Sequence, residues 1–262
     1  VQNDEADSSV DVVINQISDG HDFLLRHFNV RPRIAWQVDP FGHSALTPTI
    51  FSLAGYEAMV INRIHHQLKS NYKRSRNMEF IWRASPSFGD STEMFTHVLH
   101  THYAAPVGFD WEEGSPGISD YNLAQRAQDL VNSLKGRSEA YQTDQLLVPW
   151  GDDFKFQNAG WQYSNMDQLI KYINEHPDMG VKISYSTLSR YFDAVHASAT
   201  KNQIKFPVCD GDFFPYADNE DSYWTGYYTS RPFLKNQHRE AISMIRSTEI
   251  LYALTRVETK SI

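Results

Sequence analysis

The sequence has almost no cysteine and no long apolar run. Cys209 is the one cysteine among 262 residues, so a disulfide within the chain is excluded. A single cysteine does not indicate whether the protein works in an oxidising or a reducing compartment. No apolar stretch approaches the length of about 20 residues that a membrane-spanning helix needs, and no Asn-x-Ser/Thr glycosylation site occurs. The start, VQNDEADSSV, is polar and acidic and shows no secretory signal. We therefore expect no membrane span in this chain, and a secretory address would have to come from elsewhere.

Stretches of basic residues are also missing. The formal net charge is −8, and neither sign of charge forms a long run. An acidic chain without a basic stripe argues against nucleic acid as the main partner, because phosphate binding needs clustered Lys and Arg. It gives little reason to expect binding to an anionic membrane. Aromatic residues make up 13% of the chain, which suits stacking on sugars or bases, although core packing accounts for most of them.

Apolar residues follow helical and strand periodicity in alternation. A chain that is 41% hydrophobic can bury a sizeable core in one large domain or slightly more. We expect strand–helix alternation with short links, which implies an α/β fold with a parallel sheet. The helices are predicted at 8–28, 44–55, 119–136, 164–176, 187–198 and 239–256, and the strands at 31–39, 57–63, 144–151 and 181–186.

Several polar side chains stand where these predicted strands end. Asp39, Arg63 and the pair Asp152–Asp153 each follow an apolar strand. Ligands of α/β folds meet the carboxyl ends of the strands, so we expect these residues to share one crevice.

The segment IAWQVDPFGHSA places Asp39 directly before Pro, an aromatic residue, Gly and His. An Asp-Pro pair is also a common turn initiator, and that alternative stays open. Arg63 could pair with a carboxylate in the crevice or lie on the surface. The histidines form no HExxH or comparable metal-binding spacing.

The segment LLVPWGDDFKF ends a second strand in two carboxylates, Asp152 and Asp153. A solvated turn would explain them too. Carboxylates at the ends of two separate strands, however, are what glycoside hydrolysis uses. One ionised group attacks the anomeric carbon, and one protonated group donates to the leaving oxygen.

Five motifs resemble glycoside hydrolase family 38, the class II α-mannosidases of lysosome and Golgi. They are AWQVDPFGHSA, VINRIHH, LLVPWGDDFKF, DGDFFPYAD and YWTGYYTSRP, and they stand in the order and nearly at the spacing of that family. The resemblance covers almost the whole chain.

The resemblance implies a role for each matching residue. Asp39 corresponds to the nucleophile, which is also a zinc ligand, and Asp153 to the general acid/base. Substrate contacts are implied for Phe41, Arg63, Tyr103, Asp152 and Trp224.

The sequence also departs from the family pattern. The His-x-Asp pair that supplies two zinc ligands and the His-Asp pair that supplies another are not in this sequence. The remaining ligands would come from other segments of the same enzyme, so we expect this chain to be one piece of it. Ala104 replaces an aspartate of Golgi members, and the short loop near FDWEEGSPG looks lysosomal, whereas DDFKF and YFDAVHAS look like Golgi members.

The resemblance implies a seven-stranded parallel α/β barrel followed by the start of a helical bundle. Residues 1–230 are predicted to form the catalytic barrel domain without its first strand, and 231–262 the first helix of a three-helix module. The implied function is retaining, Zn²⁺-assisted removal of terminal α-mannose from N-glycans through a covalent mannosyl-enzyme.

The implied location is the secretory pathway, with the lysosome or vacuole ahead of the Golgi, and assembly as a homodimer is an option. Two alternatives stay open. One is a polysaccharide deacetylase-like metal hydrolase, for which the needed His-x-x-x-His pair is absent. The other is an inactive, glycan-binding relative of the same fold.

Overall fold

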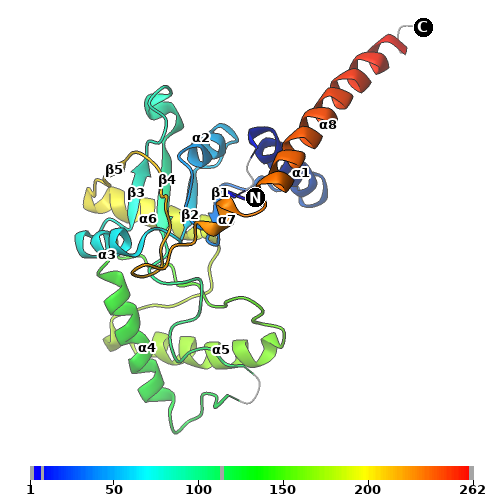
Figure 1. Ribbon diagram of the computed structural model, residues 1–262. Coiled ribbons are helices and arrows are strands. Elements are labelled where there is room, and N and C mark those ends of the chain that lie inside the picture. The colour runs from blue at the N-terminus through cyan, green and yellow to red at the C-terminus, as the bar shows by residue number, and fades with distance from the viewer. Residues whose placement is uncertain (1–2, 7–8, 113–114, 260–262) are drawn as a thin grey trace.

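A central sheet with helices around it forms the body of the protein. The computed structural model describes residues 3–6, 9–112 and 115–259 (Figure 1). The strands are β1 (Ile34–Gln37), β2 (Ala58–Ile61), β3 (Glu79–Trp82), β4 (Met94–Val98) and β5 (Val208–Cys209). The helices are α1 (Val10–Phe28), α2 (Leu46–Leu53), α3 (His66–Ser75), α4 (Leu123–Ser138), α5 (Ala159–Glu175), α6 (Leu188–Asn202), α7 (Gly226–Thr229) and α8 (Pro232–Thr259), with short 3₁₀ turns at Gly89–Thr92 and Pro177–Met179.

The five strands are ordered β1-β2-β4-β3-β5. Strands β1, β2 and β4 run parallel, whereas β3 runs antiparallel to β4. Only residues 83–93 link β3 to β4, which is too short for the helical crossover that parallel neighbours usually need. The predicted α/β class is thus confirmed. The predicted seven-stranded parallel barrel is not: the described residues form an open, mixed sheet of five strands.

Strand β2 lies in the middle of the core, and its successive side chains face opposite layers. Met59 and Ile61 pack in one cluster with Phe51 of α2 and Ile17 of α1. On the other face, Val60 packs in a cluster with Phe192 of α6. Helices on both faces therefore exclude water from the sheet.

Two predicted strands do not form. Residues 144–151 and 181–186 lie outside any ladder of the described chain. Apolar side chains from both segments instead pack against the cluster between α4 and α5, which includes Leu130 and Leu169. This second core lies apart from the sheet in Figure 1. Apolar patterning predicted correctly that side chains of these segments contact a core, but their backbones join no sheet.

Helix α8 projects away from the sheet (Figure 1). Large apolar side chains along it, including Phe233, Met244 and Leu251, are exposed. The predicted boundary between 1–230 and 231–262, and the bundle to which this helix would belong, stay predictions. No helix in the described ranges is long and apolar enough to cross a membrane.

Candidate active site

Three parallel strands deliver the polar residues to one edge of the sheet. Asp39 follows β1, Arg63 follows β2, and Tyr103 lies a few residues beyond β4. Val38 is buried just before Asp39, whose side chain is 60% exposed. The apolar strand therefore ends by presenting a carboxylate to the space outside the sheet.

Asp39 accepts hydrogen bonds from two neighbours through a single oxygen. Arg63 donates to Oδ1 from Nη2 at 2.6 Å and from Nε at 3.1 Å, and the hydroxyl of Tyr103 donates to it at 2.9 Å. Partial burial acts to raise the pKa of Asp39, but these hydrogen bonds outweigh it and leave the pKa below its ordinary value. Asp39 is therefore held ionised, with Oδ2 free of hydrogen bonds from the described residues.

Tyr103 connects the two carboxylates predicted to be catalytic. Its hydroxyl oxygen lies 2.9 Å from Oδ1 of Asp39 and 3.4 Å from Oδ1 of Asp153. The two Oδ1 atoms can therefore be no farther apart than the sum of these distances, about 6.3 Å. Burial, followed by the hydrogen bond to Asp39, raises the pKa of Tyr103 to about 12, so its hydroxyl keeps its proton at neutral pH.

A cage of aromatic rings surrounds Arg63, whose side chain is only 12% exposed. The guanidinium carbon lies 5.1 Å from the ring centre of Phe41, 5.0 Å from that of Trp224 and 5.8 Å from that of Tyr216. Phe41 also contacts Trp224 and Tyr227, with ring centres 4.9 and 4.4 Å apart. Such rings attract the cation and restrict its side chain, so the donors on Asp39 are held in place.

Gly42 allows the turn after Asp39 to lie against a distant segment. It has φ +96°, and a Cβ there would lie 2.5 Å from Cδ1 of Phe214 and 2.7 Å from the carbonyl oxygen of Phe213. His43 and Phe213 exchange backbone hydrogen bonds beside it. The glycine of the Asp-Pro-Phe-Gly-His motif is thus needed for both conformation and space.

Asp152 and Asp153 lie in the loop that precedes α5. Asp152 has φ +135°, a region that a non-glycine residue rarely adopts, and its Oδ1 accepts the backbone N–H of Asp153 at 2.8 Å. The side chain of Asp152 faces His102, whose Nε2 lies 3.5 Å from Oδ1. Two neighbouring carboxylates thus point to different partners, one to His102 and one to Tyr103.

The described residues do not by themselves make a metal site. No three His, Cys, Asp or Glu side chains among them gather closely enough to hold a metal ion. The adjacent His65 and His66 stack on each other, and His65 caps α3. Asp39 is the one predicted zinc ligand here, and its largely exposed carboxylate fits that role.

The structure gathers six of the predicted residues, Asp39, Phe41, Arg63, Tyr103, Asp153 and Trp224, and places Asp152 beside them. Sequence reasoning missed Tyr216, Tyr227 and His102, although the first two lie within motifs already singled out.

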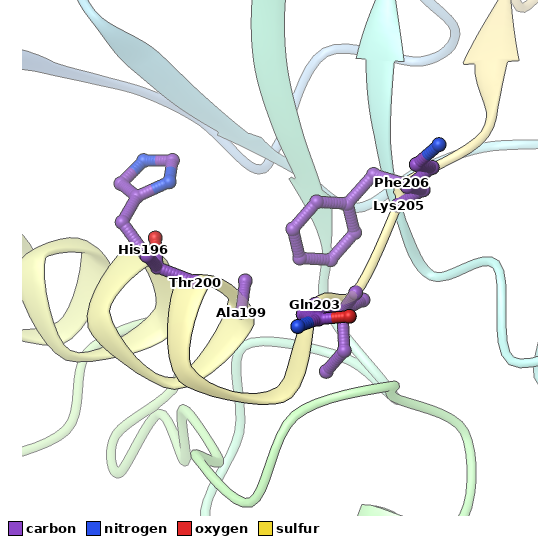
Figure 2. A pocket seen from close by; sticks show the side chains of 7 residues that line it. His196, Ala199, Thr200, Gln203, Lys205 and Phe206 are labelled. Carbon is purple, nitrogen blue, oxygen red and sulfur yellow. The ribbon is translucent and has the colours of Figure 1, made fainter.

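A hollow elsewhere on the surface is not part of this site. Figure 2 shows His196 and Thr200 of α6 and Lys205 and Phe206 before β5 lining it, with neither carboxylate among its residues.

Comparisons with known proteins concern the family and the fold of the chain. The family model of the glycosyl hydrolases family 38 N-terminal domain matches residues 1–219. Alpha-mannosidase F of Dictyostelium discoideum is 40% identical over 262 residues, which cover 98% of this chain and 26% of that protein. Alpha-mannosidase 2 of Rattus norvegicus is 37% identical, and the lysosomal alpha-mannosidase of D. discoideum 39%; the alignments cover 97% and 94% of this chain and 25% of each relative.

The fold resembles that of a solved protein. The crystal structure of an alpha-mannosidase from Enterococcus faecalis V583 matches with a TM-score of 0.58 and 19% identity, covering 81% of this chain and 21% of that one. At this identity the likeness concerns the fold alone. The chain spans about a quarter of the length of the relatives above.

The crowding at Gly42 generates a stability prediction. Gly42→Ala should lose about 1–2 kcal/mol from the left-handed conformation and about 1–3 kcal/mol more from the clash with Phe213 and Phe214. Gly55→Ala is the matched control, because Gly55 has φ +91° with open space around its Cβ position. Urea unfolding followed by tryptophan fluorescence measures both. Equal losses would mean that the close approach to Phe213 contributes nothing.

Proposed function

The chain belongs to glycosyl hydrolase family 38, and from this premise we propose that it carries the two catalytic carboxylates of a retaining α-mannosidase. The substrates would be terminal α-mannosyl linkages of N-glycans. The observation that carries the proposal is the hydroxyl of Tyr103, which lies within hydrogen-bonding distance of both Asp39 and Asp153.

Asp39 is the nucleophile in this proposal. Its Oδ1 is occupied by Arg63 and Tyr103, which leaves Oδ2 to attack the anomeric carbon. The new Oδ2–C1 bond forms as the bond from C1 to the leaving oxygen breaks, which gives a covalent mannosyl-enzyme. Arg63 holds the oxygen that does not react and so fixes the direction of attack.

Asp153 supplies and then removes the proton. In the first step its carboxylic acid donates to the leaving oxygen. In the second its carboxylate takes a proton from water, whose oxygen attacks C1 and releases Asp39. The single proton of Tyr103 goes to Asp39, the shorter contact. The contact of the same hydroxyl with Oδ1 of Asp153 is longer, 3.4 Å, and keeps the carboxyl group of Asp153 near that of Asp39.

The separation of the carboxylates supports retention. Retaining glycosidases hold the two groups about 5–5.5 Å apart, and inverting ones about 6.5–9.5 Å, which leaves room for water. The ceiling of about 6.3 Å between the Oδ1 atoms lies below the inverting range. Attack by Asp39 itself is thus favoured over attack by a water molecule between the two groups.

The aromatic rings beside Asp39 form the proposed sugar site. Phe41 and Trp224 lie in contact with each other, and Tyr227 joins Phe41 from α7. Their faces suit the C–H surface of a pyranose, while Asp152 offers a carboxylate to its hydroxyls. The same residues would serve a glycan-binding relative without activity, but the close approach of Asp39 and Asp153 to Tyr103 favours hydrolysis.

Zinc is part of the proposal only through Asp39. The carboxylate of Asp39 would be the ligand from this chain, and the other ligands would come from segments of the protein outside it. A bound zinc would polarise the sugar hydroxyls and favour the ionised form of its ligand. A lysosomal location within the secretory pathway is likewise proposed, supported by the lysosomal alpha-mannosidase among the relatives.

The division of roles predicts two different defects in the full-length protein. Asp39→Asn should lower kcat on the order of 10⁴-fold or more with every substrate, because no mannosyl-enzyme can form. Asp153→Asn should accept α-mannosyl fluoride, whose leaving group needs no proton, and then accumulate the mannosyl-enzyme because no base activates water. Intact-protein mass spectrometry should find one added mannosyl residue.

The matched control is Asp120→Asn, an exposed carboxylate away from the site, which should turn over like the wild type and show no adduct. If Asp153→Asn releases a burst of fluoride while the protein stays unlabelled, Asp39 is not the nucleophile.

The zinc proposal predicts loss of activity on chelation. Full-length protein dialysed against a chelator should lose aryl α-mannoside hydrolysis, and added Zn²⁺ should restore it while Mg²⁺ should not, because magnesium sites use oxygen ligands rather than imidazole. Full activity in protein that is free of zinc by elemental analysis would refute the zinc requirement.

A further inference from the structure

A line of polar contacts runs from the interior to the acid/base loop. Nζ of Lys69, on α3, donates to the backbone oxygen and to Oδ1 of Asn62, each at 2.9 Å. Nδ2 of Asn62 lies 3.4 Å from Nδ1 of His102, and Nε2 of His102 lies 3.5 Å from Oδ1 of Asp152. Four residues from four segments thus connect α3 to the residue next to Asp153.

Lys69 determines which way the amide of Asn62 points. Oδ1 accepts from the lysine, so the NH₂ group must be the end that faces His102. Asn62 is buried, and its backbone oxygen is held by the same lysine. The amide therefore has one satisfied orientation.

That orientation determines the tautomer of His102. Nδ1 faces a donor and must accept, so the proton of the neutral ring lies on Nε2, which faces Asp152. Burial, followed by the charge of Arg63, lowers the pKa of His102 and favours the neutral ring. The protonated ring nitrogen thus lies 3.5 Å from a carboxylate oxygen of Asp152.

Asp152 needs such support. Its backbone is held at φ +135°, and the same Oδ1 that faces His102 accepts the N–H of Asp153. An unfavourable backbone conformation persists only where surrounding contacts hold it. The ring of His102 also packs on that of Tyr103, with centres 3.7 Å apart. One imidazole therefore contacts both Asp152, which precedes Asp153 in the chain, and Tyr103, whose hydroxyl contacts Asp153.

We propose that His102, held in its Nε2-protonated form by Asn62 and Lys69, is a positioning residue that fixes Asp152 and through it the proton-donating geometry of Asp153. This inference rests on the proposed function, in which Asp153 is the acid. In this proposal His102 acts through Asp152 and not on the reacting atoms.

Two substitutions in the full-length protein separate positioning from packing. His102→Gln places an amide N–H where Nε2 was, whereas His102→Asn places one near Nδ1 and leaves Asp152 without a donor. Aryl α-mannosides with acidic and with weakly acidic phenols are compared by kcat/KM, which reports the first chemical step. The weakly acidic phenols need the proton from Asp153, and the acidic ones do not.

His102→Asn should lower kcat/KM by roughly 10-fold to 100-fold for weakly acidic phenols, and by less than about threefold for acidic ones. His102→Gln should recover most of the loss. His196→Asn, on α6 beside the hollow of Figure 2, is the control for replacing a histidine by asparagine. It should leave kcat/KM unchanged for both classes of phenol. An equal loss for both phenol classes, or equal behaviour of Gln and Asn, would overturn the inference.

A second measurement keeps this result apart from failure of the proposed function. Wild-type protein without activity on any aryl α-mannoside would refute the proposed function. Crystal structures of the full-length variants then still test the positioning. His102→Asn should show Asp152 and Asp153 displaced or disordered, and His102→Gln should keep them in place. An unmoved loop in His102→Asn would overturn the inference.

Discussion

The ion pair between Arg63 and Asp39 is the interaction on which the rest of the site depends. The pair fixes the orientation of Asp39 more than it stabilises the fold. A pair whose carboxylate is largely exposed contributes only about 0–1 kcal/mol to stability. The aromatic rings around the guanidinium restrict its position, so it occupies one oxygen of Asp39 and leaves the other free. The hydroxyl of Tyr103 contacts the same oxygen of Asp39 and also Oδ1 of Asp153, and so links the two carboxylates. The sheet contributes by ending three parallel strands at the same edge.

The residues of the site were predictable to the extent that they belong to motifs at strand ends. Asp39 and Arg63 follow β1 and β2, strands found from apolar runs, and the parallel pairing of those strands brings the two side chains together. Tyr216 and His102 were not predictable in the same way. Their contacts depend on how the irregular segment 210–225 folds back and on which way one buried amide points, and neither leaves a periodic signal in the sequence.

The secondary structure was also predictable only where a local apolar pattern was enough to identify an element. Apolar periodicity located most of the long helices but missed α3, which has no buried residue. Strands β3 and β4 were missed because each carries a charged or polar residue at a buried position. Glu79 and His97 are both buried and contact each other, with Oε1 and Nδ1 2.9 Å apart. Conversely, residues 145–150 are apolar enough for a strand yet lie in no ladder. A strand requires a neighbour for its backbone groups, and single-residue patterns do not show which neighbour is present.

The central claim is that Asp39 attacks the sugar directly while Asp153 handles the proton, as their common contact with Tyr103 supports. The most direct test is proton NMR of the first product released from an aryl α-mannoside by the full-length protein, recorded before the free sugar mutarotates. Two displacements at C1 predict that α-mannose appears first and that the β-anomer grows in later. If β-mannose appears first, a water molecule attacked C1 in a single step, and the role given to Asp39 is wrong.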